Sequence, residues 1–176
     1  MSRHIVLIGL PGAGKTTAGR LAAESLKAPF VDLDALVERR MQMPVGRIFG
    51  EFGEAKFRQL EREAMVQALA AEPSLIAPGG GWAAQPGQLE LAEPHALIVY
   101  LKCLAITAAR RMAGGAARPM LAEGEGDPAE RLRELLHDRE PFYLRAAFEV
   151  KTDIGNARSV ADEIVGIGRS HGGWAL

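Results

Sequence analysis

Residues 4–17 read HIVLIGLPGAGKTT, in which an apolar run leads directly into a glycine-rich segment with one lysine and two threonines. The spacing from Gly9 to Thr16 fits G-x-x-x-x-G-K-[ST], a loop that cradles phosphates, and the segment lies between an expected strand and an expected helix. A plain strand-to-helix turn, the simplest alternative, would not require lysine followed by threonine. The stretch therefore predicts an α/β fold with a phosphate-binding loop.

Each residue type in this loop has a physical reason to be there. Gly12 and Gly14 allow positive φ angles, so several backbone N–H groups can point at one phosphate chain. Lys15 adds a mobile positive charge, and Thr16 begins the next helix, where the dipole favours an anion and the hydroxyl can ligate Mg2+. We therefore predict nucleotide binding by Gly12, Ala13, Gly14, Lys15, Thr16 and Thr17.

The chain has an ordinary globular composition. Its 176 residues suit one domain spanning 1–176, with 48% hydrophobic and 24% charged residues. The 21 basic and 22 acidic residues leave a net charge of -1, so no global field holds nucleic acid or an anionic membrane. The single Cys103 excludes an internal disulfide, and no apolar stretch is long enough to cross a membrane. We expect a cytoplasmic monomer whose partner is a small molecule, not nucleic acid or a membrane.

Strands and helices are expected to alternate along the chain. Apolar runs predict strands at 4–9, 30–34, 74–81, 96–102 and 148–152, and helical periodicity predicts helices at 16–28, 35–41, 54–72, 105–113, 128–147 and 159–169. This alternation predicts a three-layer α/β/α fold with a mostly parallel sheet of about five strands, and ligands bind at the carboxyl ends of such strands. The glycine-rich segment 114–127 has little periodicity and is a candidate mobile lid.

Two carboxylates follow the expected second strand. Asp32 and Asp34 are two residues apart, so both face the same side if the extended geometry persists. One could then hold Mg2+ through water while the other meets a hydroxyl group. The alternative makes Asp34 the N-cap of the helix that follows, and both roles are possible at once.

A charged stripe and a glycine run supply further candidates. Glu54, Arg58 and Glu61 lie on one face of the expected helix 54–72, at spacings of four and three residues. The stripe is either a solvated ion-pair ladder or an arginine held by acids and aimed at a ligand carboxylate. The run at residues 79–81 lacks Cβ atoms, so a flat ligand can approach its backbone.

Two arginines lie in or behind the candidate lid. Arg118 belongs to the segment ARPML, where a swinging guanidinium could reach a transferring phosphoryl group. Arg139 lies on the helix that follows, in the segment HDREPFY. Because a closing lid excludes water and completes a site, Arg118 is a candidate catalytic residue.

Together these segments resemble the shikimate kinase family, within the phosphate-loop small-molecule kinases of the nucleoside-monophosphate-kinase type. The segments GLPGAGKTT, VDLD, IFGEFGEAKFRQLE, GGG, RPML and DREPFYLRAA occur in the family's order and at its spacings, over nearly the whole chain. The resemblance implies transfer of a phosphoryl group from ATP, with Mg2+, to the 3-hydroxyl of shikimate. The products would be 3-phosphoshikimate and ADP, a step of chorismate and aromatic amino acid biosynthesis.

The resemblance also implies roles for individual residues. It places shikimate against Asp34, Arg58, Gly80 and Arg139, within a substrate-binding helical segment at about 34–61, and the glycine run adds Gly79 and Gly81 to this set. It places Arg118 over the phosphates and Arg111 on the nucleotide side. Catalysis is then expected from Lys15, Asp34 and Arg118, and metal binding from Thr16 and Asp32.

Some positions depart from the family pattern. Trp82 follows the glycine run where a small residue is common, and it could narrow the pocket or stack beside the ligand. Met120 stands where leucine is usual, and the segment containing Asn156 and Arg158 only loosely matches the one that touches adenine. Two alternatives stay open: a related sugar-acid kinase of the gluconate type, and a module that binds ATP and shikimate without turnover.

Overall fold

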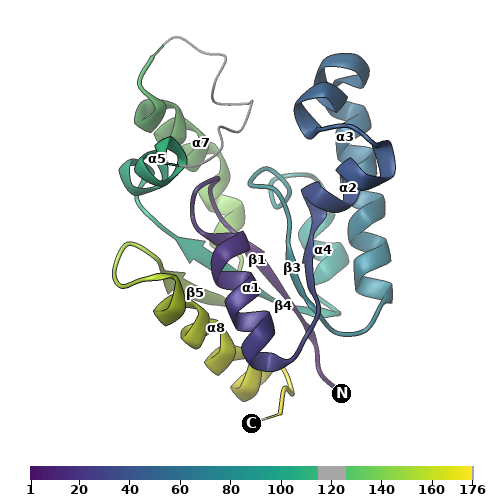
Figure 1. Cartoon of the computed structure of the whole chain (residues 1–176), viewed down its shortest axis with the longest axis vertical. Coiled ribbons are helices and arrows are strands. Elements are labelled where there is room, and N and C mark those ends of the chain that lie inside the picture. The colour runs from purple at the N-terminus through teal and green to yellow at the C-terminus, as the bar shows by residue number, and fades with distance from the viewer. Residues whose placement is uncertain (115–125, 176) are drawn as a thin grey trace.

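The structure, a computed structural model, describes residues 1–114 and 126–175. One sheet of five parallel strands has the order β2-β3-β1-β4-β5 (Figure 1). The strands are β1 (His4–Ile8), β2 (Phe30–Asp32), β3 (Leu75–Ala77), β4 (Ala96–Lys102) and β5 (Phe148–Lys151). Because β1 is the central strand, the loop that follows it leaves the sheet at the middle of its carboxyl edge.

Helices flank both faces of this sheet. The described helices are α1 (Lys15–Leu26), α2 (Leu33–Met41), α3 (Val45–Ala70), α4 (Gln88–Ala92), α5 (Ala105–Ala113), α7 (Pro128–Tyr143) and α8 (Ala157–His171). Helices α1 and α8 pack side by side on one face, α2 packs on α3, and α5 packs on α7 (Figure 1). In the described residues no helix is both long and apolar enough to span a bilayer.

The burial of the central strands explains their sequences. Every residue of β1 is buried, and so is every residue of β4 except Lys102. Parallel strands covered by helices on both faces have no solvated side, so they read as continuous apolar runs and do not alternate with polar residues. The predicted parallel α/β fold with about five strands is confirmed, and β4 and α5 have the predicted bounds.

The second strand ends earlier than the sequence predicts, and a single side chain is the cause. Asp32 is the N-cap of α2, and its Oδ1 accepts a hydrogen bond from the backbone N–H of Ala35 at 3.1 Å. The cap stops β2 at Asp32 and places Asp34 in the first helical turn. The alternative in which Asp34 caps this helix is therefore wrong, and the extended geometry does not persist to Asp34.

Other boundaries also differ from the prediction. Helix α3 begins at Val45, and Gly53 interrupts it with φ 80° and ψ 168°, so the predicted start at 54 marks only its second part. Asn156 caps α8 through Ser159, which starts that helix two residues early, and the short α4 was not predicted. The predicted lid at 114–127 falls mostly in 115–125, outside the described residues, together with Arg118 and Met120.

Candidate active site

The candidate residues gather at the carboxyl edge of the sheet. The phosphate loop (residues 9–17) follows β1, Asp32 ends β2, the glycine turn (residues 79–81) follows β3, and Thr152 follows β5. Carboxyl ends of parallel strands meet at one edge, and for this reason segments far apart in sequence share one site. Figure 1 shows α2 and α3 rising on one side of this edge and α5 and α7 on the other.

The phosphate loop has the backbone expected of an anion cradle. Gly12 and Gly14 have φ angles of 82° and 93°, and Gly14 is the N-cap of α1 without a side-chain cap, so α1 presents its N-terminal N–H groups to the loop. A Cβ on Gly12 would lie 2.6 Å from the carbonyl oxygen of Ala108, so α5 packs directly on the loop. The buried Lys15 lies along the loop, and its Nζ donates to the carbonyl oxygens of Gly9 and Leu10 at 2.7 and 2.8 Å.

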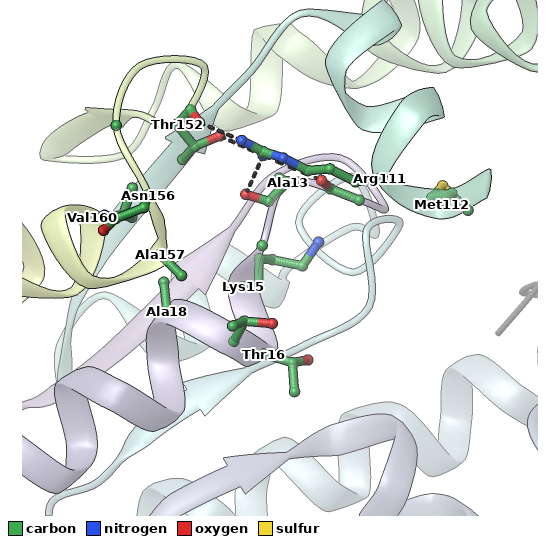
Figure 2. A pocket seen from close by; sticks show the side chains of 14 residues that line it. Ala13, Lys15, Thr16, Ala18, Arg111, Met112, Thr152, Asn156, Ala157 and Val160 are labelled. Carbon is green, nitrogen blue, oxygen red and sulfur yellow. Dashed lines mark hydrogen bonds between the residues drawn. The ribbon is translucent and has the colours of Figure 1, made fainter. Parts of the chain in front are cut away.

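A cavity of about 500 Å³ adjoins the phosphate loop (Figure 2). It is lined by Gly12, Ala13, Gly14, Lys15, Thr16, Thr17, Ala18, Arg111, Met112, Thr152, Gly155, Asn156, Ala157 and Val160. This volume lies in the ordinary range for small-molecule and cofactor sites. All six loop residues predicted to bind nucleotide, and Arg111, line this one cavity.

Arg111 connects the two walls of the cavity. Its Nη1 donates to the carbonyl oxygen of Ala13 at 3.3 Å and to Oγ1 of Thr152 at 3.0 Å, and its Nη2 donates to the carbonyl oxygen of Thr152 (Figure 2). The sequence analysis did not single out Thr152, and it matched the start of α8 only loosely to the segment that touches adenine in the family. The asparagine and serine that cap α8 were the available signal, since they place Asn156 at a helix start beside the loop.

A threonine and an aspartate form the candidate metal site. Oγ1 of Thr16 donates to Oδ2 of Asp32 at 3.3 Å, while Oδ1 of the same carboxylate caps α2. Capping therefore orients the carboxylate toward the phosphate loop. One hydroxyl and one carboxylate beside bound phosphates suit Mg2+, which usually takes one or two protein oxygens and keeps several waters. Within residues 1–114 and 126–175 no group of three or more histidine, cysteine, aspartate or glutamate side chains could hold a metal.

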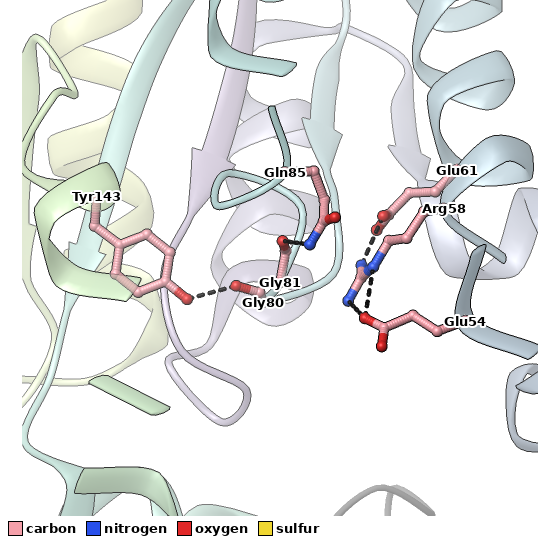
Figure 3. A network of polar contacts seen from close by, with 7 residues as sticks. All are labelled: Glu54, Arg58, Glu61, Gly80, Gly81, Gln85 and Tyr143. Atoms are coloured by element: carbon pink, nitrogen blue, oxygen red, sulfur yellow. Dashed lines mark hydrogen bonds and ion pairs between the residues drawn. The ribbon is translucent and has the colours of Figure 1, made fainter. Parts of the chain in front are cut away.

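A second cluster surrounds the glycine turn. Arg58 donates to Oε2 of Glu61 at 2.8 Å and pairs with Oε1 of Glu54 at 3.4 Å (Figure 3). The Glu61 side chain is only 1% exposed and that of Arg58 15%, whereas Glu54 is exposed. A fully solvated ion-pair ladder is therefore excluded, and the alternative in which acids hold Arg58 fits the geometry. Burial raises the pKa of Glu61 to about 7, against the opposing effect of the Arg58 charge.

Each glycine of the turn meets a different part of the site. A Cβ on Gly79 would lie 3.3 Å from Oδ1 of Asp34 and 3.3 Å from Oε1 of Glu61. On Gly80 it would lie 2.7 Å from Cδ of Pro11, in the phosphate loop. A real Cβ does not approach other atoms this closely, so the glycine turn and the phosphate loop pack against each other at Gly80.

Two arginines converge on the last glycine. A Cβ on Gly81 would lie 2.5 Å from Nη2 of Arg58 and 3.3 Å from Nη2 of Arg139. Arg58 comes from α3 and Arg139 from α7, so these helices bring two positive charges to one point. A side chain at this position would displace the guanidinium groups from the glycine turn. Such a pair of planar, charged donors is suited to grip a carboxylate.

Two side chains that the sequence did not single out hold this turn. The Tyr143 hydroxyl donates to the carbonyl oxygen of Gly80 at 2.5 Å, and Nε2 of Gln85 donates to the carbonyl oxygen of Gly81 at 3.2 Å (Figure 3). Tyr143 follows Arg139 by four residues on a helix, and this spacing was a usable signal. Trp82 is fully buried in the core, so its ring has no accessible face on which a ligand could stack.

The family comparison agrees with this geometry. The family model described as shikimate kinase matches residues 11–167. A shikimate kinase of Mycobacterium avium (strain 104) is 41% identical over 166 residues, which cover 94% of this chain and 93% of the relative. The solved structure of a shikimate kinase from Acinetobacter baumannii in complex with shikimate superposes with a TM-score of 0.90 at 33% identity, covering 97% of this chain and 94% of that one.

A more distant structure separates fold from family. A gluconokinase from Sinorhizobium meliloti 1021 has a TM-score of 0.65 at 18% identity, over 98% of this chain and 94% of its own. At that identity the likeness shows a shared fold alone. The match to the shikimate kinases is closer in both sequence and structure. This chain belongs to the shikimate kinase family.

Proposed function

We propose that this protein transfers the terminal phosphoryl group of ATP to the 3-hydroxyl of shikimate, giving 3-phosphoshikimate and ADP in aromatic amino acid biosynthesis. The observation that carries the proposal is the convergence of Arg58 and Arg139 on Gly81, next to a phosphate loop that Gly80 contacts at Pro11. Two guanidinium groups beside a phosphate cradle suit an acceptor that carries a carboxylate. Shikimate is such an acceptor, and family membership supports the choice.

The nucleotide half of the proposed site consists of the phosphate loop and the cavity beside it, and it binds and orients the phosphates. We assign the phosphates to the loop N–H groups of Gly12 and Gly14 and to Lys15, and the rest of the nucleotide to the cavity that Arg111 borders. Thr16 and Asp32 would hold Mg2+, which when bound neutralises charge on the phosphates. Phosphoryl transfer needs positioning and charge stabilisation more than covalent help, and a buried lysine among oriented N–H groups supplies both.

The substrate half of the proposed site consists of the glycine turn with Asp34, Arg58 and Arg139, and it orients the acceptor hydroxyl. Arg58 and Arg139 would bind the carboxylate of shikimate, which leaves its hydroxyl groups toward Asp34 and the phosphate loop. The Asp34 carboxylate would accept a hydrogen bond from the 3-hydroxyl and take its proton as the phosphoryl group arrives. Arg118 stays a proposal made from the sequence: it would cover the charge that develops on the transferring group.

Three further proposals concern the protein as a whole. Residues 1–176 act as one domain, in which the described strands form one sheet and share one core. We place the enzyme in the cytoplasm, where ATP is made and a free cysteine such as the buried Cys103 stays reduced.

We also propose that the protein is a monomer, because one chain supplies all the described residues of the site. Light scattering would test this.

Release of ADP tests the function directly. Purified protein with ATP and Mg2+ is given shikimate, gluconate or a nucleoside monophosphate in separate reactions. We expect ADP release with shikimate alone. Release with gluconate or the nucleotide would keep the phosphate loop and refute the substrate, whereas ATP binding without release in all three reactions would support a module without turnover.

A further inference from the structure

We propose that Tyr143 is a positioning residue for the acceptor: its hydroxyl fixes the orientation of the Gly80–Gly81 peptide at the point where Arg58 and Arg139 meet. The inference rests on the proposed function, because it assigns Tyr143 to the binding of the shikimate carboxylate. Tyr143 itself does not contact the reacting atoms. It acts through the glycine turn and through Arg139.

The hydroxyl of Tyr143 is in a position to do this. The Tyr143 side chain is fully buried, and its Oη donates to the Gly80 carbonyl oxygen at 2.5 Å (Figure 3). Burial raises the pKa of Tyr143 to about 12, with the charge of Arg139 acting in the opposite direction. The hydroxyl therefore keeps its proton at any physiological pH and remains a donor.

Fixing one carbonyl fixes a donor on the other side. The peptide unit is planar and trans, so the Gly80 carbonyl and the Gly81 N–H point in opposite directions. When Tyr143 holds the carbonyl, the direction of that N–H is set as well. Because Gly81 lies against both guanidinium groups, this N–H belongs to the same small region that would receive a carboxylate.

Three consecutive glycines need outside anchors to stay in one conformation. Glycine has more backbone freedom to lose than any other residue, and the turn contributes no side chains of its own. Within the turn, the Trp82 N–H donates to the Gly79 carbonyl oxygen at 3.1 Å. The outer anchors are Tyr143 on Gly80 and Gln85 on Gly81. Tyr143 is the buried one, so its bond competes least with water.

Tyr143 also links the turn to one of the arginines. Arg139 lies four residues before Tyr143 on α7, so the two side chains lie on the same face of the helix, one turn apart. The positive charge of Arg139 opposes the rise in the pKa of the Tyr143 hydroxyl. The residue that anchors the Gly80 carbonyl and the guanidinium that lies against Gly81 therefore come from adjacent turns of one helix.

The chain offers a matched control next to Tyr143. Tyr100 is also buried, and the two rings are 5.1 Å apart between centroids. The Tyr100 hydroxyl, however, donates to Oε1 of Glu140 at 3.5 Å and has no bond to the glycine turn. Tyr100→Phe and Tyr143→Phe thus each remove one tyrosine hydroxyl from the same part of the core. Only Tyr143→Phe also removes the hydrogen bond to the Gly80 carbonyl.

The test compares KM values of the two variants in the shikimate-dependent ADP release assay. We expect Tyr143→Phe to raise KM for shikimate about tenfold, the loss of roughly one hydrogen bond, with KM for MgATP close to unchanged. Tyr100→Phe should leave both KM values close to those of the parent. If the Tyr143 hydroxyl were merely structural, both variants would have a lower melting temperature and the KM for shikimate would not change.

A second substitution separates the donor from the shape of the ring and covers the case in which Tyr143→Phe does not fold. With 4-aminophenylalanine at position 143 an N–H donor stands in place of the hydroxyl, and KM for shikimate should return close to the parent value. Equal shikimate KM values for Tyr143→Phe and Tyr100→Phe, or no recovery with the amino group, would overturn the positioning role while the proposed function stood. A parent protein without shikimate-dependent ADP release would overturn both.

Discussion

The phosphate loop and the glycine turn touch at Pro11 and Gly80, yet they are built in opposite ways. The phosphate loop is one continuous stretch of nine residues that runs from the end of β1 into the first turn of α1, and it uses backbone N–H groups, a helix N-terminus and one lysine. The substrate half takes side chains from α2, α3 and α7 and arranges them around a turn that has none of its own.

This contrast separates two kinds of information in a sequence. A backbone site depends on φ angles that a short run of glycines permits, so its position can be read from neighbouring residues. A site built from side chains depends on which helices the fold brings together, and a local sequence pattern does not predict which helices those are. The two halves should therefore respond differently to substitution, and this expectation can be tested.

The largest expected effect is on the nucleotide half. Lys15→Ala should lower kcat at least about a thousandfold, because it removes a buried positive charge from the phosphate cradle. Steady-state ADP release measures this. Lys27→Asn, at the C-cap of α1, is the control, since asparagine tolerates its left-handed backbone. Near-parental turnover by Lys15→Ala would refute the phosphate-loop mechanism.

The next effect is confined to the substrate half. Arg58→Ala should raise KM for shikimate roughly a hundredfold and leave KM for MgATP close to unchanged, because it removes one of the two guanidinium groups proposed to bind the carboxylate, and losing one partner of a desolvated charge pair costs about 2–5 kcal/mol. The control is Arg40→Ala, whose ion pair with Glu63 is exposed. A thermal melt of each variant is needed as well, because Glu61 loses its partner. An unchanged KM for shikimate would remove Arg58 from the site.

A smaller effect should appear in the KM values of both substrates, because it arises where the two halves of the site touch. Gly80→Ala places a methyl group 2.7 Å from Cδ of Pro11, so it should raise both KM values and destabilise the fold by about 1–3 kcal/mol. Gly166→Ala in α8 is the matched control, because a Cβ there meets nothing within 4 Å and should be neutral or stabilising. If Gly80→Ala changed KM for shikimate alone, the two halves would not be coupled at this contact.

The last prediction concerns how the stability of the fold depends on pH. The pKa of Glu61 is about 7 in the folded protein against 4.5 for an ordinary glutamate, so between these pH values the folded state holds a proton that the unfolded state has released. Ionisation of Glu61 therefore destabilises the fold as pH rises through this window. Glutamine does not titrate, so Glu61→Gln should gain stability over the parent by at most about 1.4 kcal/mol per pH unit.

Urea unfolding at pH 5 and pH 8 measures this difference. The control is Glu63→Gln, which replaces an exposed carboxylate on the same helix, and its stability relative to the parent should change little between the two pH values. A stability difference between Glu61→Gln and the parent that stays constant with pH would contradict the raised pKa of Glu61.

The features that could be predicted from the sequence are those that depend on neighbouring residues, as in the phosphate loop. The loop at 9–17, the alternation of elements and the central apolar strands were predictable because each depends on neighbouring residues. The boundary at Asp32 was not, because strand continuation and helix capping compete there, and the cap forms. Thr152 and the start of α8 reach the cavity only because β5 lies beside β4 in the sheet.

In the substrate half the sequence alone left the charged stripe undecided. The resemblance to the shikimate kinases selected Arg58 and Arg139, but the burial of Glu61 and the bond from Tyr143 to Gly80 depend on packing between helices distant in sequence. The burial of Trp82 also depends on such packing, and its position after the glycine turn did not predict it.

The most direct test of the two separate halves is binding without turnover. Calorimetric titration with shikimate alone and with MgADP alone is carried out on the parent, Lys15→Ala and Arg58→Ala. We predict that Arg58→Ala loses shikimate affinity and keeps that for MgADP, and that Lys15→Ala does the reverse. If Arg58→Ala weakened MgADP binding as much as shikimate binding, the division into a backbone-built nucleotide half and a side-chain-built substrate half would be contradicted.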